Sequence, residues 1–181
     1  RFSGDREAPM SEGCVVFSHG KDGEPWGTKI SALAETARVE GYAIDSVDYR
    51  GIDDVRQRTA LLLDTCKSVR GELVLVGSSL GGYISLAAAA SLHARGVFLM
   101  APAIYMEGLP PLKPGAFDCP VTIIHGWQDD VVPVEHSFRF AGEHHAELHV
   151  VGDDHRLQGN VPFLKYLFEY FLIALDMPRR R

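Results

Sequence analysis

The expected fold of this chain is decided by the segment LVLVGSSLGGYISLAAAA, residues 73–90. Four apolar residues of strand length lead into the turn Gly77-Ser78-Ser79-Leu80-Gly81, and the small residues that follow favour a closely packed helix. A Gly-x-Ser-x-Gly turn between a buried strand and a buried helix strains the backbone and presents the serine oxygen to a cleft. Ser79 is therefore a candidate nucleophile. The other interpretation is a glycine-rich turn that binds phosphate.

Strands and helices alternate on both sides of this segment. The predicted strands are residues 14–18, 42–49, 72–76, 97–100, 121–124 and 147–151. The predicted helices are residues 25–40, 53–69, 80–93, 134–144 and 161–175. Several strands are apolar without alternation, as expected where both faces of a sheet are covered, and strands alternating with helices form βαβ units. We expect an α/β fold: a doubly wound, mainly parallel six-stranded sheet with helices on both faces.

The length of 181 residues fits a single domain, residues 1–181, since no linker divides the chain. We expect residues 1–11 and 177–181 to be flexible ends. Residues 101–120 contain five prolines and show no periodicity, which predicts a long irregular loop.

The composition is that of a globular protein, with 46% hydrophobic and 23% charged residues. The net charge of −6 argues against a nucleic-acid surface, and no apolar run is long enough to span a membrane. Cys14, Cys66 and Cys119 are odd in number and lie in largely apolar surroundings, which favours reduced thiols and a cytoplasmic location. Because the chain lacks an initial Met, a removed targeting segment stays open.

An activated serine needs a base within hydrogen-bond reach and a carboxylate that orients the base. In a parallel sheet both should come from loops at the carboxyl ends of later strands. His155 fits the base, because it lies between the last predicted strand and the last predicted helix. Asp129 and Asp130 both follow residues 121–124 as candidate acids, and their position alone does not choose between them.

Other groups complete or compete with this arrangement. A developing oxyanion needs two N–H donors, and we expect them to be the backbone N–H groups of Leu80, after the serine, and Lys21, after the first strand. A metal site that uses His144, His145 and His149 is a competing interpretation, but the spacing of these three histidines is poor for metal binding.

Four motifs together resemble the α/β-hydrolase superfamily over residues 12–175. They are Phe17-Ser18-His19-Gly20, Gly77-Ser78-Ser79-Leu80-Gly81-Gly82, His125-Gly126-Trp127-Gln128-Asp129 with Val132-Pro133, and Asp154-His155. The chain is most similar to small members without a lid, such as dienelactone hydrolases and short bacterial esterase-like hydrolases. The resemblance implies a minimal α/β-hydrolase fold without a cap domain. It also implies a catalytic triad of Ser79, His155 and Asp129. On this resemblance the acid is Asp129 and not Asp130.

The function that the resemblance implies is hydrolysis of a small ester through a covalent acyl-enzyme, with no cofactor and no metal. The expected partner is a small-molecule ester or thioester, not a nucleic acid or a membrane; the sequence does not indicate an oligomeric state. Thioesterase, peptidase, carbon–carbon hydrolase and acyltransferase activities on the same triad stay open, as does a non-catalytic ligand-binding protein of the same fold. Pocket candidates are Tyr105, Met106, Leu109 and Trp127, although the first three could equally just cover the sheet edge.

Overall fold

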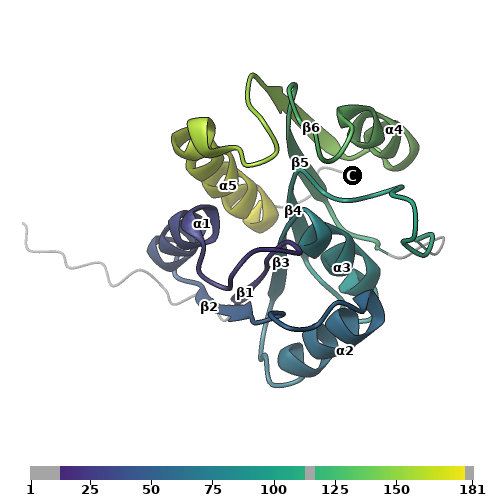
Figure 1. Ribbon diagram of the computed structural model, residues 1–181. Coiled ribbons are helices and arrows are strands. Elements are labelled where there is room, and N and C mark those ends of the chain that lie inside the picture. Colours follow the sequence, from purple (N-terminus) through teal and green to yellow (C-terminus); the bar gives the residue numbers. More distant parts are fainter. Residues whose placement is uncertain (1–12, 113–116, 178–181) are drawn as a thin grey trace, which may run out of the picture.

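A computed structural model describes residues 13–112 and 117–177 of the chain. Its centre is a six-stranded parallel sheet in the order β2-β1-β3-β4-β5-β6 (Figure 1). The strands are β1 (Cys14–Ser18), β2 (Ala43–Val47), β3 (Leu73–Ser78), β4 (Gly96–Met100), β5 (Val121–Gly126) and β6 (Glu147–Val151). The predicted α/β fold class with a parallel six-stranded sheet is confirmed.

Helices cover both faces of the sheet. They are α1 (Thr28–Val39), α2 (Val55–Cys66), α3 (Leu80–Ala89), α4 (Val134–His144) and α5 (Val161–Asp176), preceded by the short 3₁₀ helix η1 (Gln158–Asn160). Helices α1 and α5 lie on one face, and α2, α3 and α4 lie on the other (Figure 1). Each layer has its own apolar core, centred on Phe168 and Leu33 under α1 and α5 and on Leu62 and Ile84 under α2 and α3.

The strand order places the loops that carry the candidate site residues at one edge of the sheet. The chain passes from β1 outward to β2 and then returns to the other side of β1 as β3, so the strand order reverses between β1 and β3. Ser18, the last residue of β1, is paired with Gly77 near the end of β3. Since every strand is parallel, the loops after β1, β3, β5 and β6 leave from the same edge, where ligands bind in open α/β sheets.

Several helix boundaries differ from the predicted ones for local reasons. Helix α1 begins at Thr28 because the preceding residues form a turn in which the Gly27 N–H donates to the carbonyl of Glu24. Helix α2 begins after Asp54, whose carboxylate accepts the N–H groups at the start of the helix. Helix α3 ends at Ala89, and His93 lies in the left-handed region with φ 50°.

The ends predicted to be flexible, residues 1–11 and 177–181, lie outside the described residues except for Met177. Of the predicted irregular loop, residues 113–116 are also outside them, while residues 101–112 and 117–120 contain no helix or strand, as predicted. Within the described ranges, none of the helices is both long and apolar enough to cross a membrane.

Candidate active site

Ser79 stands at the junction of β3 and α3 with a strained backbone. Its φ of 53° and ψ of −120° are rare for a residue with a side chain and cost of order 1–3 kcal/mol. The strain is held by the main chain: the Ser79 N–H donates to the carbonyl of Met100 at 2.9 Å, and the Ser79 carbonyl accepts from the N–H of Ala103 at 3.0 Å. This geometry projects the hydroxyl from the sheet edge.

Close backbone contacts explain the two glycines of the motif. A Cβ built on Gly81 would lie 2.0 Å from the carbonyl oxygen of Ser18, so only glycine lets α3 pass the end of β1. A Cβ on Gly77 would lie 2.4 Å from the carbonyl oxygen of Gly81. The two glycines therefore allow β3, α3 and the end of β1 to pack closely around Ser79.

The structure brings Ser79, His155 and Asp129 into one hydrogen-bonded row. His155 Nε2 lies 3.0 Å from Ser79 Oγ, and His155 Nδ1 lies 2.7 Å from Asp129 Oδ2. Because a carboxylate only accepts, Nδ1 carries the ring proton and donates a hydrogen bond to Asp129. Nε2 is then unprotonated and can accept the serine proton. Of the two candidate acids, Asp129 is the one whose carboxylate reaches His155.

The side chain of Asp129 is fully buried, and both of its carboxylate oxygens accept hydrogen bonds. Its Oδ1 accepts the backbone N–H groups of Val131 at 2.9 Å and Val132 at 2.8 Å. Burial raises the pKa of this carboxyl, but the N–H of Val132, the ring of His155 and the N–H of Val131 outweigh burial and hold the pKa below its usual value. The residue is therefore a fixed anion behind His155.

A second imidazole, that of His125, also contacts this carboxylate. His125 is completely buried, and its Nε2 lies 3.0 Å from both Asp129 Oδ2 and the carbonyl oxygen of Val132. A carbonyl only accepts, so Nε2 carries the proton, and the Ser137 hydroxyl, 2.7 Å away, donates to Nδ1. Burial lowers the pKa of His125, so a neutral ring lies beside the Asp129 carboxylate with its N–H donated to the Val132 carbonyl.

The two N–H donors predicted for the oxyanion lie in elements beside the serine. Leu80 is the first residue of α3, where backbone N–H groups have no partner inside the helix. Lys21 lies in the loop after β1, and this loop touches the serine: a Cβ built on Gly20 would be 3.2 Å from Ser79 Cβ. The role of both N–H groups as oxyanion donors stays a prediction.

One further cation, Lys29, belongs to the surroundings of the row and was not indicated by the sequence. It is partly buried in the first turn of α1. Burial lowers the pKa of Lys29 to about 8, although the carboxylates of Asp129, Asp153 and Asp154 favour its charged form. The row of Ser79, His155 and Asp129 is therefore subject to the charge of Lys29 as well as to that of the carboxylates.

The candidate pocket residues lie in different settings. Leu109 packs against the core under α2 and α3, and Met106 closes a turn by accepting the Leu109 N–H at 3.2 Å. Tyr105 donates its hydroxyl to Glu143 of α4 at 2.5 Å. Trp127 is 56% exposed. Among the alternative metal histidines, His144 packs against Phe140 and His149 lies 2.7 Å from Glu147.

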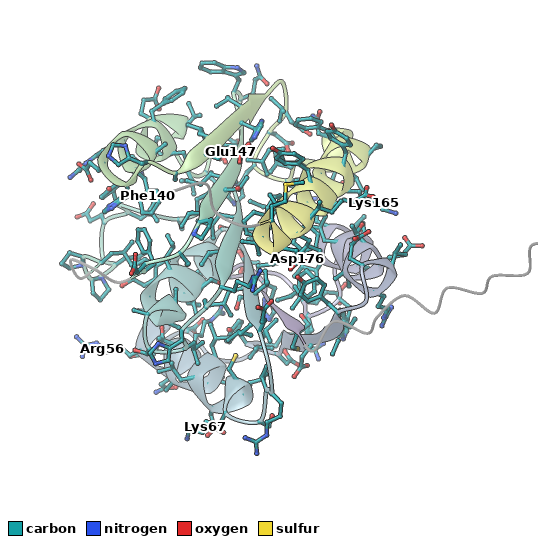
Figure 2. All side chains as sticks on the ribbon, turned by 180° about the vertical axis from the view of Figure 1, so that it is seen from behind. Arg56, Lys67, Phe140, Glu147, Lys165 and Asp176 are labelled. Atoms are coloured by element: carbon teal, nitrogen blue, oxygen red, sulfur yellow. The ribbon has the colours of Figure 1, made fainter. Side chains whose placement is uncertain are left out.

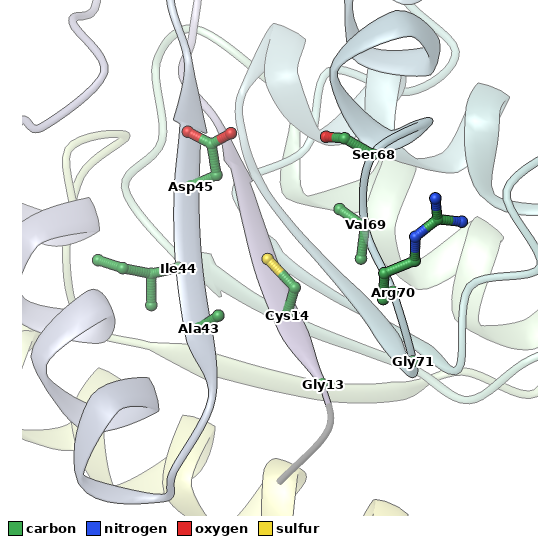
Figure 3. A pocket seen from close by; sticks show the side chains of 9 residues that line it. All are labelled: Gly13, Cys14, Ala43, Ile44, Asp45, Ser68, Val69, Arg70 and Gly71. Carbon is green, nitrogen blue, oxygen red and sulfur yellow. The ribbon is translucent and has the colours of Figure 1, made fainter. Parts of the chain in front are cut away.

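A groove of about 660 Å³ lies elsewhere on the molecule (Figure 3). Its lining includes Cys14 and Ala43, the first residues of β1 and β2, and Gly71 just before β3. Asp45 and Arg70 also line it (Figure 3). Because these are the amino ends of the strands, the groove is at the opposite end of the sheet from Ser79 and is not part of the candidate active site.

Two contacts around the row were missed at the level of sequence. His125 belongs to one of the four motifs, but its position in the sequence does not indicate that its Nε2 lies 3.0 Å from Asp129 Oδ2. Arg58 was not considered, although it is 2% exposed and binds the loop after β1. The available signal was its spacing, since Arg58 shares the buried stripe of α2 with Leu62 and Cys66.

Comparisons with known proteins identify a family and several similar structures. The model of the Alpha/beta hydrolase family matches residues 15–174. A protein from Xanthomonas campestris pv. campestris, assigned to the alpha/beta hydrolase superfamily, is 32% identical, with a TM-score of 0.84 over 90% of this chain and 99% of that one. The search of curated proteins finds no match.

Two more distant structures share the fold. Est1E from Butyrivibrio proteoclasticus is 20% identical and superposes with a TM-score of 0.79 over 94% of this chain and 90% of its own. A second Xanthomonas campestris protein, described as an α/β serine hydrolase without a lid, is 17% identical, with a TM-score of 0.78 over 98% of this chain and 88% of that one.

Proposed function

This chain belongs to the alpha/beta hydrolase family, and from that premise we propose that it is a serine hydrolase that cleaves an ester-type acyl bond in a small molecule. The observation that carries the proposal is the hydrogen-bonded row from Ser79 Oγ through His155 to Asp129. Activation of a serine hydroxyl requires an accepting nitrogen and a carboxylate behind it, and the row supplies both.

The proposed reaction begins with attack of Ser79 Oγ on the ester carbonyl carbon. As the new carbon–oxygen bond forms, the serine proton moves to His155 Nε2, and Asp129 stabilises the imidazolium. The negative charge on the former carbonyl oxygen is accepted by the N–H groups of Leu80 and Lys21. The ester bond then breaks, and the departing alkoxide takes the proton from His155.

Water completes the cycle by attacking the acyl group on Ser79. His155 accepts a proton from this water, and the second tetrahedral species collapses to a carboxylic acid while His155 returns the proton to Ser79 Oγ.

We place this activity in the cytoplasm, with a small ester or thioester as substrate. The support is chemical: Cys14 and Cys66 are buried thiols, and burial raises the pKa of both, that of Cys66 to about 12. The net charge of −6 makes polyanions poor partners.

Turnover of p-nitrophenyl esters with acyl chains of increasing length tests the proposal. We expect a burst of p-nitrophenol equal to the enzyme concentration where deacylation is slow, and we expect Ser79→Ala to abolish both the burst and steady turnover. Ser85→Ala, at a buried serine of the same helix, serves as the control that retains both. Turnover that persists in Ser79→Ala would contradict the proposal, and a wild-type protein inert toward every ester and thioester would favour a ligand-binding role.

A further inference from the structure

Arg58 is a buried cation whose role the reaction above does not explain. It projects from α2, is only 2% exposed, and is the largest fully buried side chain in the described part of the molecule. Among the described residues, its hydrogen bonds end on main-chain carbonyls: Nε donates to Ile52 at 2.6 Å, Nη1 to Gly20 at 3.3 Å and Nη2 to Lys21 at 3.2 Å. No carboxylate in the described part of the chain forms an ion pair with it, and burying such a charge is costly, so its position calls for a specific reason.

Two of those carbonyls belong to the loop after β1 that touches the nucleophile. The carbonyl of Gly20 and the N–H of Lys21 are the two ends of a single peptide unit. A trans peptide is planar, and its C=O and N–H point in opposite directions. The direction of the Gly20 carbonyl therefore determines the direction of the Lys21 N–H, which we assign to the oxyanion.

Other side chains hold the same peptide unit. His19 Nε2 accepts the N–H of Tyr49 at 2.9 Å, so its proton is on Nδ1, which donates to the Gly20 carbonyl at 2.7 Å. The Tyr49 hydroxyl lies 2.9 Å from Ser18 Oγ, and the guanidinium of Arg58 lies over the Tyr49 ring, 5.4 Å from its centre. Arg58 thus anchors a small network that ends on the Gly20 carbonyl.

We propose that Arg58 is a positioning residue, which fixes the peptide unit between Gly20 and Lys21 so that the Lys21 N–H points to the oxygen that becomes negative during the reaction. The inference rests on the proposed serine-hydrolase function. The planar fork of arginine suits the task, because its two terminal nitrogens hold two successive carbonyls at once. A cation donating to the carbonyl also polarises the peptide and strengthens its N–H as a donor.

The experiment compares Arg58→Met with Arg56→Met. Arg56 is on the same helix but is exposed, and Figure 2 shows its side chain at the edge of the molecule. For Arg58→Met we expect kcat for a p-nitrophenyl ester to fall by about 10- to 100-fold with KM nearly unchanged, since loss of a complete oxyanion donor costs about 100- to 1,000-fold. Arg56→Met should retain wild-type kcat.

Binding of an arylboronic acid separates positioning from a purely structural role. The boron forms a tetrahedral adduct with Ser79 Oγ, so its affinity should fall in Arg58→Met by about the same factor as kcat. A lower melting temperature with wild-type kcat per titrated active site, and unchanged boronate affinity, would overturn the inference.

Arg58→Lys decides the question if Arg58→Met does not fold. Lysine keeps the charge but has a single nitrogen that cannot hold two carbonyls as the fork does, so we expect kcat about tenfold below wild type with KM unchanged. Wild-type kcat in this variant would overturn the inference. A wild-type protein without Ser79-dependent turnover would instead remove the proposed function, and the inference with it.

Discussion

Asp129 distributes its two carboxylate oxygens between distinct partners. Oδ1 is held by the backbone of the loop after β5, through the N–H groups of Val131 and Val132, and Oδ2 faces the rings of His155 and His125. A carboxylate that is fixed by backbone donors keeps its orientation and charge when the neighbouring imidazole becomes protonated. In the proposed reaction, Asp129 therefore stabilises protonated His155 and does not exchange protons with it.

This arrangement predicts different effects for the two adjacent aspartates. Asp129→Asn should lower kcat by about 10³- to 10⁴-fold, because an amide can donate to His155 Nδ1 and favour the wrong tautomer. Asp130→Asn, the matched control one residue along the chain, should change kcat less than about threefold. Ester turnover measured side by side checks both values, and the reverse order of effects would move the acid role to Asp130.

At the scale of elements, the contact between β1 and α3 determines how closely the loop after β1 approaches Ser79. The backbone of Gly81 lies directly against the Ser18 carbonyl, with no room for a methyl group. The paired register of β1 and β3 fixes the other side of this contact. A small displacement of α3 would therefore change the distance between Ser79 and the loop after β1, which contains Lys21.

Gly81→Ala should be strongly destabilising. The new Cβ would lie 2.0 Å from the Ser18 oxygen, a backbone atom that cannot move without shifting β1, and we expect a loss of about 3 kcal/mol in the free energy of unfolding. Gly142→Ala is the control, because among the described residues no atom other than those of its chain neighbours and its own helix backbone lies within 4 Å of its Cβ. It is inside α4, where alanine adds up to about 1 kcal/mol. Urea unfolding of both variants provides the measurement. Equal free energies of unfolding for Gly81→Ala and Gly142→Ala would show that α3 does not pack tightly against the end of β1.

Much of this element arrangement could be predicted from local patterns, and the remainder depends on distant contacts. The apolar runs around residues 14–18 and 73–76 predict buried parallel strands because the covering helices leave no polar face. The end of α3 was predicted four residues late, since alanines continue the helical pattern while His93 adopts a left-handed conformation. Arg58 could not be assigned, because its partners, Gly20 and Lys21, lie 38 and 37 residues away in the sequence.

Across the whole molecule, two buried histidines link folding to pH. Burial lowers the pKa of His19, although its bond to the Gly20 carbonyl opposes this, and burial also lowers the pKa of His125. Both rings are neutral when folded, whereas the unfolded chain takes up protons near the ordinary pKa of about 6.5. Below that pH the unfolded state binds more protons, so stability is complete above it and is lost as pH falls toward the folded pKa values.

The free energy of unfolding should therefore decrease from pH 7.5 to pH 5.5. Each histidine contributes up to about 1.4 kcal/mol per pH unit in this window. His125→Gln should reduce the slope, because it removes one of the two groups. Urea titrations at several pH values give the slope, and a stability that is constant or rises as the pH falls would contradict the assignment of two neutral buried rings.

The central claim is that Ser79 is an activated nucleophile, and covalent labelling with a fluorophosphonate probe tests it most directly. The probe's phosphorus should bond to Ser79 Oγ with loss of fluoride, which intact-protein mass spectrometry would register as one adduct and peptide mapping would assign to Ser79. Ser79→Ala should gain no adduct, and Ser85→Ala should be labelled like the wild type. An unlabelled wild-type protein, or a label that persists in Ser79→Ala, would contradict the account.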